Sequence, residues 1–270
     1  MAFTGLPRST PPDPRTALAG HPPDAPAHAW LDEAVARITD RPAAIGALFP
    51  AARRRCGHAR LDEHWTVDEA ARAVLITALP LEGEPLAGEL AGLFRHGDPA
   101  EQRAVLKALP LLDDTPDALA GEHPGDHGRL GDRALPLVRE ALRGNDSSLI
   151  EAALGPYGAA RLPDGEYRQA VLKCVFYEIP LDRIAGLDVR ADDELARMLA
   201  DFAHERVAAG RDVPPDIWPV VRAFPVLDTF TDLLTAETHA AAPDRREAAL
   251  RALKALREAT ALTAEPEEEA

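Results

Sequence analysis

The sequence predicts an all-α protein, and three observations support this fold class. Its 270 residues are rich in alanine, leucine, arginine and glutamate, and only 5% of them are aromatic, a composition that favours helix over strand. Aspartates suited to cap helices recur along the chain at similar intervals. No segment shows the sustained two-residue alternation of a half-buried strand. The length allows one elongated domain or two small ones.

Four aspartates are predicted to open helices of similar length. They are Asp98, Asp146, Asp192 and Asp244, which lie 46–52 residues apart. At the first of them, Pro99 follows the cap and Glu101 completes a capping box. Three of the four follow a further predicted helix, at 86–96, 135–144 and 230–239. Antiparallel helix pairs at this period are typical of HEAT-like repeats, so we predict a short solenoid or, alternatively, an irregular helical bundle.

Each capped helix carries apolar residues at helical spacing, which predicts the face that it buries. In chain order, these are Val105, Leu109 and Leu112; Leu149, Ala153 and Leu154; Leu195, Met198, Leu199 and Phe202; and Leu250, Leu253 and Leu256.

The ends of the chain differ in composition from its middle. Residues 1–27 hold seven of the 25 prolines and are predicted to form a disordered, extended arm. Residues 28–262 are predicted to form a single all-helical domain, interrupted by a flexible loop rich in glycine and proline at 115–132. Residues 263–270 form an acidic tail.

Charge and composition exclude several classes of protein. The net charge of −15 opposes binding to nucleic acid, whose phosphates attract basic surfaces. No apolar run is long enough to span a bilayer, so we expect no membrane insertion, and the first residues lack a secretory signal pattern. Only Cys56 and Cys174 are present, which is typical of a protein of the reducing cytoplasm, where we expect this chain.

The common motifs of catalysis and metal binding are missing from the sequence. It holds no glycine-rich phosphate loop and no GxSxG, HExxH or CxxC motif. Two groups of metal-ligand residue types lack standard zinc spacing: Cys56, His58, Asp62 and His64, and then Glu122, His123, Asp126 and His127. The pair Asp201 and His204 has no second matching pair, as a di-iron bundle would need. We therefore expect no metal and no cofactor.

Three charged features each allow a structural and a functional interpretation. Arg53–Arg55 precede Gly57 at a helix end, where cations and a left-handed glycine cap are favourable, but they are also the densest positive patch and could hold an anion. The charged helix face at 194–206 is either a solvated surface with ion pairs or the wall of a ligand groove. Lys173, within the apolar stretch 170–176, either extends its ammonium to solvent or lines a groove.

Five segments of the sequence resemble the EboA family, whose members are encoded in the bacterial ebo operon. They are RRRCG (53–57), WTVDEAARAVLI (65–76), RQAVLKCVF (168–176), GLDVRADDELARMLADFAHERVAAGR (186–211) and IWPVVRAF (217–224). The resemblance covers about residues 28–225. It implies a role beside enzymes of secondary-metabolite production or export, without an assigned reaction or catalytic residues.

The resemblance implies a set of ligand- or partner-binding candidates among the matched charged and aromatic residues. They are Arg54, Arg55, Trp65, Asp68, Arg72, Lys173, Asp188, Arg190, Asp201, His204, Glu205 and Arg211. Two functions remain open. The first is a non-catalytic accessory protein or scaffold. It would bind either a metabolite of the pathway, which is an anion in one form of this hypothesis, or other proteins of the operon. The second is an enzyme that acts on an anionic cyclitol or a prenyl-phosphate-like intermediate.

Overall fold

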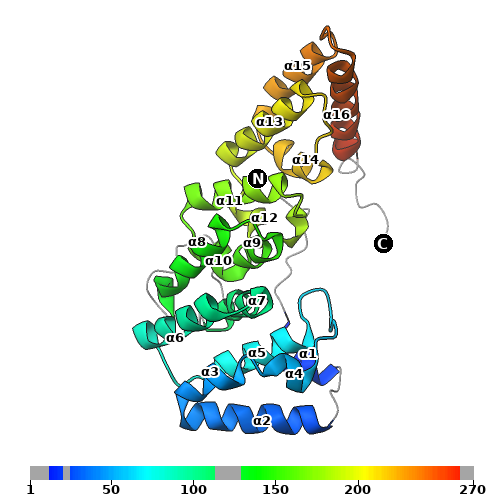
Figure 1. Ribbon diagram of the computed structural model, residues 1–270. Coiled ribbons are helices and arrows are strands. Elements are labelled where there is room, and N and C mark those ends of the chain that lie inside the picture. The colour runs from blue at the N-terminus through cyan, green and yellow to red at the C-terminus, as the bar shows by residue number, and fades with distance from the viewer. Residues whose placement is uncertain (1–11, 21–24, 113–128, 262–270) are drawn as a thin grey trace, which may run out of the picture. The chain divides into compact units, whose positions relative to one another are not determined.

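The computed structural model describes residues 12–20, 25–112 and 129–261, and these residues are almost entirely helical or in turns (Figure 1). They form sixteen α-helices and five short 3₁₀ helices. The one β-type pairing in these ranges is an isolated bridge between Arg60 and Thr66. The prediction of an all-α fold is confirmed. The described residues divide into two compact units, which we call the N-terminal unit (up to Pro163) and the C-terminal unit (from Asp164).

The N-terminal unit is built around helix α5 (Val67–Thr77), in which every residue from Val67 to Ile76 is buried. Its other helices are α1 (Pro14–Gly20), α2 (Ala25–Asp40), α3 (Ile45–Leu48), α4 (Ala52–Cys56), α6 (Gly83–His96), α7 (Pro99–Ala108), α8 (Leu135–Arg143), α9 (Ser147–Ala153) and α10 (Pro156–Arg161), with 3₁₀ helices at Pro42–Ala44, Leu109–Leu112 and Gly131–Ala134. Helix α5 packs against α1, α2, α4 and α7, and α7 packs in turn against α6 and α9.

The C-terminal unit is organised by helix α13 (Asp193–Ala208), which packs against four neighbours (Figure 1). These are α11 (Asp164–Phe176), α14 (Trp218–Val221), α15 (Val226–Glu237) and α16 (Pro243–Ala261); the unit also holds α12 (Leu187–Arg190) and 3₁₀ helices at Leu181–Arg183 and Pro215–Ile217. Leu199, Trp218, Phe230 and Leu234 are among the fully buried residues of its core.

Three of the four predicted helix caps are confirmed. Asp98 accepts a hydrogen bond from the backbone N–H of Glu101 at 2.9 Å, and the Glu101 carboxylate accepts one from the N–H of Asp98 at 3.1 Å. Asp146 and Asp192 accept bonds from the first turns of α9 and α13. Asp244 is not a cap, because α16 begins one residue earlier at Pro243, and proline is favoured at the first helical position.

Most of the predicted apolar stripes face the core, but Leu250 does not. Its side chain is 57% exposed, while Ala252, Leu253 and Leu256 are buried. At about 100° per residue, Leu250 lies about 60° around α16 from Leu253, on the side away from Ala252. The buried face of α16 is therefore rotated from the predicted one toward the alanines of the helix, whose small side chains allow the neighbouring helices to approach closely.

Two further local expectations differ from the structure. Leu109 and Leu112 are buried as predicted but belong to the 3₁₀ helix that follows α7. Gly57, at the end of α4, has φ 90° and ψ −174°, a positive φ without the left-handed helical ψ that we expected. Because few residues other than glycine adopt this φ, the position still requires a glycine.

The predicted extended arm contains a helix in its described part. Helix α1 begins at Pro14, where a fixed φ suits the first helical turn, and Asp13 accepts a hydrogen bond from the N–H of Thr16 at 3.0 Å. Leu18 is buried, and the carbonyl of Pro12 accepts a hydrogen bond from the Trp65 indole at 2.8 Å. Residues 1–11, most of the predicted loop at 115–132 and the acidic tail at 263–270 lie outside the described residues.

Candidate functional site

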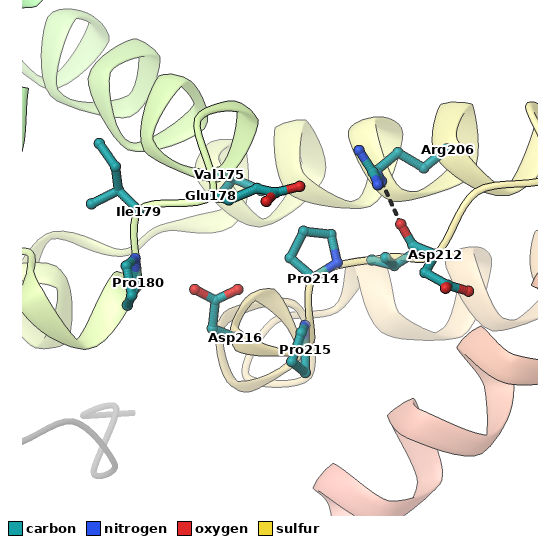
Figure 2. Close-up of a pocket in the computed structure, with 10 residues that line it drawn as sticks. Val175, Glu178, Ile179, Pro180, Arg206, Asp212, Pro214, Pro215 and Asp216 are labelled. Carbon is teal, nitrogen blue, oxygen red and sulfur yellow. Dashed lines mark hydrogen bonds between the residues drawn. The ribbon is translucent and has the colours of Figure 1, made fainter. Parts of the chain in front are cut away.

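A cavity of about 500 Å³ lies within the C-terminal unit (Figure 2). It is formed by the end of α11 with the segment that follows it, by the last turns of α13, and by the segment that leads into α14. Its lining residues are Val175, Glu178, Ile179, Pro180, Arg206, Asp212, Val213, Pro214, Pro215 and Asp216. The volume is within the range of sites that bind small molecules.

The turn after α11 places Glu178 at the cavity in an unusual backbone conformation. The N–H of Ile179 bonds to the carbonyl of Cys174 at 2.9 Å, and the N–H of Glu178 bonds to the carbonyl of Val175 at 3.2 Å. This pattern is a Schellman motif, in which the residue at position 178 adopts a left-handed conformation and is usually glycine. Glu178 has a φ of 57°, which costs a residue with a side chain about 1–2 kcal/mol.

The walls of the cavity are mainly apolar and conformationally restricted. Val175 and Ile179 belong to the lining and are buried in the unit. Pro180, Pro214 and Pro215 have fixed φ angles, so this part of the lining is stiff before any ligand binds. Such walls suit the apolar part of a small molecule, because little side-chain entropy is lost on binding.

The charged lining residues are held in different ways. The guanidinium of Arg206 lies 5.8 Å from the centre of the Phe202 ring, and its Nε donates to the carbonyl oxygen of Asp212, as Figure 2 shows. The carboxylate of Asp216 accepts a hydrogen bond from the N–H of Leu181 at 3.0 Å. The ten lining residues include no serine, cysteine, histidine or lysine, and their ionisable side chains are Arg206, Glu178, Asp212 and Asp216.

A second polar cluster is buried in the N-terminal unit, between α5 and α7. Arg72 is 1% exposed, and its guanidinium donates to Asp68 at 2.7 Å, to Glu101 at 3.4 Å and to the carbonyl of Phe49 at 3.2 Å. The same guanidinium lies 5.5 Å from the centre of the Phe49 ring. Because its charge is paired on several sides, we attribute to Arg72 a role in holding the helices together.

Glu69 forms the other half of this cluster. Its carboxylate accepts hydrogen bonds from Arg103 and, at 2.8 Å, from Lys107, while Arg103 also reaches the Ser148 hydroxyl on α9. Burial alone would raise the pKa of Glu69, but the charges and hydrogen bonds of Lys107 and Arg103 outweigh it and hold the pKa below its usual value. The Lys107 ammonium also lies 5.7 Å from the centre of the Trp65 ring.

The structure separates the predicted site residues of the N-terminal unit into two groups. Trp65, Asp68 and Arg72 are buried against other parts of the unit. Arg54 and Arg55 are exposed on α4, and no carboxylate in the described ranges forms an ion pair with either. Only the second group is open to a ligand.

The other seven predicted residues belong to the C-terminal unit, and several of them contact neighbouring side chains there. Arg190 lies 4.2 Å from the centre of the Tyr167 ring and pairs with Asp164 at 2.7 Å. The Lys173 ammonium lies 5.4 Å from the centre of the Tyr177 ring.

Asp201 pairs with Arg197 at 2.6 Å, as expected for a solvated helix face. Asp188 is half-buried, and Glu205 and Arg211 are exposed. None of the twelve predicted residues lines the cavity.

Sequence reasoning therefore missed the residues that surround the cavity. Arg206 appeared only as part of a charged helix face, and Glu178, Asp212 and Asp216 were not singled out. One signal was available, since the run Val213-Pro214-Pro215-Asp216 predicts a stiff turn that ends in a carboxylate. Nothing in the sequence placed that turn beside the end of the helix at 164–176.

His204, another predicted residue, forms a contact between three helices. Its Nε2 lies 3.1 Å from Oε1 of Glu237 on α15, and Glu237 also accepts hydrogen bonds from Arg245 on α16. The hydrogen bond from Arg245, with a smaller contribution from His204, outweighs the effect of burial and lowers the pKa of Glu237 to about 2.

We expect the stability contributed by Glu237 to depend on pH. Because its pKa is lowered on folding from the ordinary 4.5 to about 2, the carboxylate stabilises the folded state above pH 4.5, and this contribution is lost as the pH falls toward 2. Urea unfolding of the unmodified protein and of Glu237→Gln, repeated at decreasing pH, measures the effect. The two proteins should differ most near neutral pH and converge below pH 4.5. A difference that does not vary with pH would contradict the prediction.

No helix in the described parts of the chain is both long and apolar enough to cross a membrane. Within those same parts, no three or more histidine, cysteine, aspartate or glutamate side chains are placed to hold a metal ion. The fold and the cavity define the class: an all-helical protein with an apolar-walled cavity of small-molecule size.

The comparison with protein families gives a more specific result. The family model for metabolite traffic protein EboA matches residues 50–222, which include every residue of the cavity lining. The chain belongs to the EboA family. Neither the comparison with curated proteins nor the comparison with solved structures found a match.

Proposed function

We propose that this protein is a non-catalytic accessory protein of a secondary-metabolite production or export operon, and that it binds a pathway metabolite in the cavity of the C-terminal unit. The observation that carries the proposal is the cavity itself, about 500 Å³ with walls of proline, valine and isoleucine. The family description, metabolite traffic protein, favours a ligand that is bound and passed on.

The proposal includes a HEAT-like arrangement of helix pairs, through which the protein would also contact other proteins of its operon. Two pairs support it: α6 and α7 are in contact and joined by Gly97 and Asp98, and α8 and α9 are in contact and joined by residues 144–146. Helices α5, α7 and α9 pack in sequence, as repeats do. We place this function in the cytoplasm and in one functional domain, whose expected range of 28–262 is extended toward the N-terminus by α1, since α1 packs against α5.

An enzyme that acts on an anionic intermediate is the second candidate. One observation favours it: Arg54 and Arg55 are exposed, and within the described ranges neither pairs with a carboxylate. Two adjacent guanidinium groups can bind phosphate or carboxylate. Arg72 does not add to this site, because it is buried and paired with Asp68 and Glu101.

The proposed function is tested by identifying what the protein carries when it is purified from its own host. We expect mass spectrometry to detect a metabolite on the full chain that is reduced about tenfold or more on Val213→Trp, in which a large ring fills the cavity. Val189→Trp is the matched control, since Val189 belongs to the same unit, is 44% exposed and does not line the cavity.

Two outcomes would contradict this proposal. If Val213→Trp and Val189→Trp carried equal amounts of every metabolite, the cavity would not be the binding site. If incubation of the purified protein with its metabolite changed the mass of that metabolite, the enzyme would be the better interpretation. Unchanged mass together with a loss specific to Val213→Trp supports an accessory role.

Lys173 is a proposed ligand- or partner-binding residue that lies outside the cavity lining. We expect Lys173→Met to change the free energy of unfolding by no more than about 1 kcal/mol, because a partly exposed cation–π contact contributes about that much. Thermal unfolding measures this, and a larger loss would show a structural role. Reduced metabolite production in a host that carries the stable variant would support a binding role, and normal production would remove Lys173 from the proposed site.

A further inference from the structure

We propose that the cavity of the C-terminal unit selects an organic cation with an apolar body, such as a hydrophobic amine, rather than an anion or a neutral molecule. This inference rests on the proposed function, since it names the chemical class of the ligand held in the same cavity. It differs from the anionic ligand that was one of the alternatives left open by the sequence.

The first argument is the charge of the lining. The lining holds three carboxylates, those of Glu178, Asp212 and Asp216, and the only cationic side chain among the ten lining residues is Arg206. The Asp212 carboxylate forms an ion pair with Arg251 of α16 at 2.6 Å, so Glu178 and Asp216 supply the negative charge that a ligand would meet. Its Nε is occupied by the carbonyl oxygen of Asp212, and its guanidinium also lies near the Phe202 ring. An anion in this cavity would meet net negative charge, whereas a cation would be attracted to it.

The second argument is the position of two of these carboxylates. Figure 2 shows Glu178 and Asp216 on separate segments, with the Asp216 carboxylate directed toward the segment that carries Glu178 and the Glu178 carboxylate directed toward α13. One oxygen of Asp216 is fixed by the N–H of Leu181 at 3.0 Å, which orients the group. Glu178 is exposed, and it takes part in no side-chain hydrogen bond or ion pair with the described residues. Two carboxylates on either side of one space can share an ammonium group.

The third argument is the backbone at Glu178. Its φ of 57° closes the turn after α11, a position where glycine would avoid the steric cost. The steric cost is that of any residue with a Cβ atom, so the turn itself gives no reason for a carboxylate at this position. Recognition of a cation at the cavity supplies one.

The fourth argument concerns the rest of the ligand. The three lining prolines present hydrocarbon surface beside the carboxylates, with Val175 and Ile179 buried behind them. A hydrated metal ion or a small polyamine would leave this surface uncovered. An amine with an aromatic or aliphatic body would cover it and gain from the burial.

The test uses three probes of equal shape and different charge: 4-phenylbutylamine, 4-phenylbutan-1-ol and 4-phenylbutanoate. Isothermal titration of the full chain at low salt should give the tightest binding for the amine, about tenfold tighter than the alcohol, and the weakest for the acid. Glu178→Gln and Asp216→Asn should each weaken amine binding by about three- to tenfold and leave alcohol binding unchanged. The amide introduced by Asp216→Asn retains an oxygen that can accept the hydrogen bond from the N–H of Leu181.

Two further variants separate charge from folding. Glu178→Gly should melt no lower than the unmodified protein, since it removes the unfavourable side chain at φ 57°, and should still lose affinity for the amine. Asp232→Asn, which removes an exposed carboxylate of α15 outside the lining, should bind the amine normally.

The outcomes distinguish this inference from the proposed function. If the amine and the alcohol bind equally and Glu178→Gln has no effect, while Val213→Trp abolishes both, the cavity binds apolar molecules without selecting a cation. The inference is then wrong, and the proposed function stands. If no probe binds, or if Val213→Trp leaves all binding unchanged, the inference is also wrong. The proposed function is then decided separately, by mass spectrometry of the metabolite carried by the protein from its own host.

Discussion

Replacing Arg72 with leucine is expected to destabilise the N-terminal unit by about 3–5 kcal/mol. The guanidinium is 1% exposed and donates to Asp68 and Glu101. Without it, both carboxylates would remain in a buried setting with their main cationic partner removed. The loss of a buried charge partner is costly because water cannot replace it.

Urea unfolding followed by circular dichroism measures this effect. Arg54→Leu is the matched control, since Arg54 is an exposed arginine of α4 in the same unit, and its replacement should change the free energy of unfolding by no more than about 0.5 kcal/mol. If Arg72→Leu were as stable as Arg54→Leu, the cluster between α5 and α7 would not stabilise the fold. Arg72 would then return to the set of possible ligand-binding residues.

Replacing Trp65 with alanine is expected to cost about 3–5 kcal/mol, the usual range for removing a buried large aromatic side chain. Trp65 is 1% exposed, and its indole N–H donates to the carbonyl of Pro12 at 2.8 Å. Trp65→Phe keeps most of the packing but loses that hydrogen bond, so it should cost about 1–2 kcal/mol.

Thermal and urea unfolding of both Trp65 variants give these values. A normal stability of Trp65→Ala would contradict the packing role. In a host, Trp65→Phe should support normal metabolite production, because the structure attributes to Trp65 a place in the core and not in a binding surface.

The features that could be predicted from the sequence are those determined by residues close together in the chain. The capping box of Asp98 and Glu101 depends on residues three positions apart, and it was found where it was expected. The start of α16 was missed by one residue, since Pro243 and Asp244 both suit a first turn. Leu250 was assigned to the core but is exposed. The apolar periodicity of α16 fits two adjacent faces of that helix, and it does not show which of them the neighbouring helices cover.

The candidate site was less accessible to sequence analysis. The cavity is formed by the turn at 178–180 and the segment at 212–216, which the packing of α11 and α13 brings together. Asp68 and Arg72 share one face of a helix, so their pairing could be read from their spacing. The contact of Arg72 with Glu101 could not, because it depends on how α5 packs against α7.

The bond between Trp65 and the carbonyl of Pro12 has a practical consequence for producing shorter forms of this protein. The composition suggests residue 28 as the start of the folded part, and a protein trimmed there would lose both Pro12 and the buried Leu18. The apolar side of α5 that α1 covers would then be exposed to solvent, together with an indole N–H that has lost its acceptor. Such a surface promotes aggregation, so a shortened protein should begin no later than residue 12.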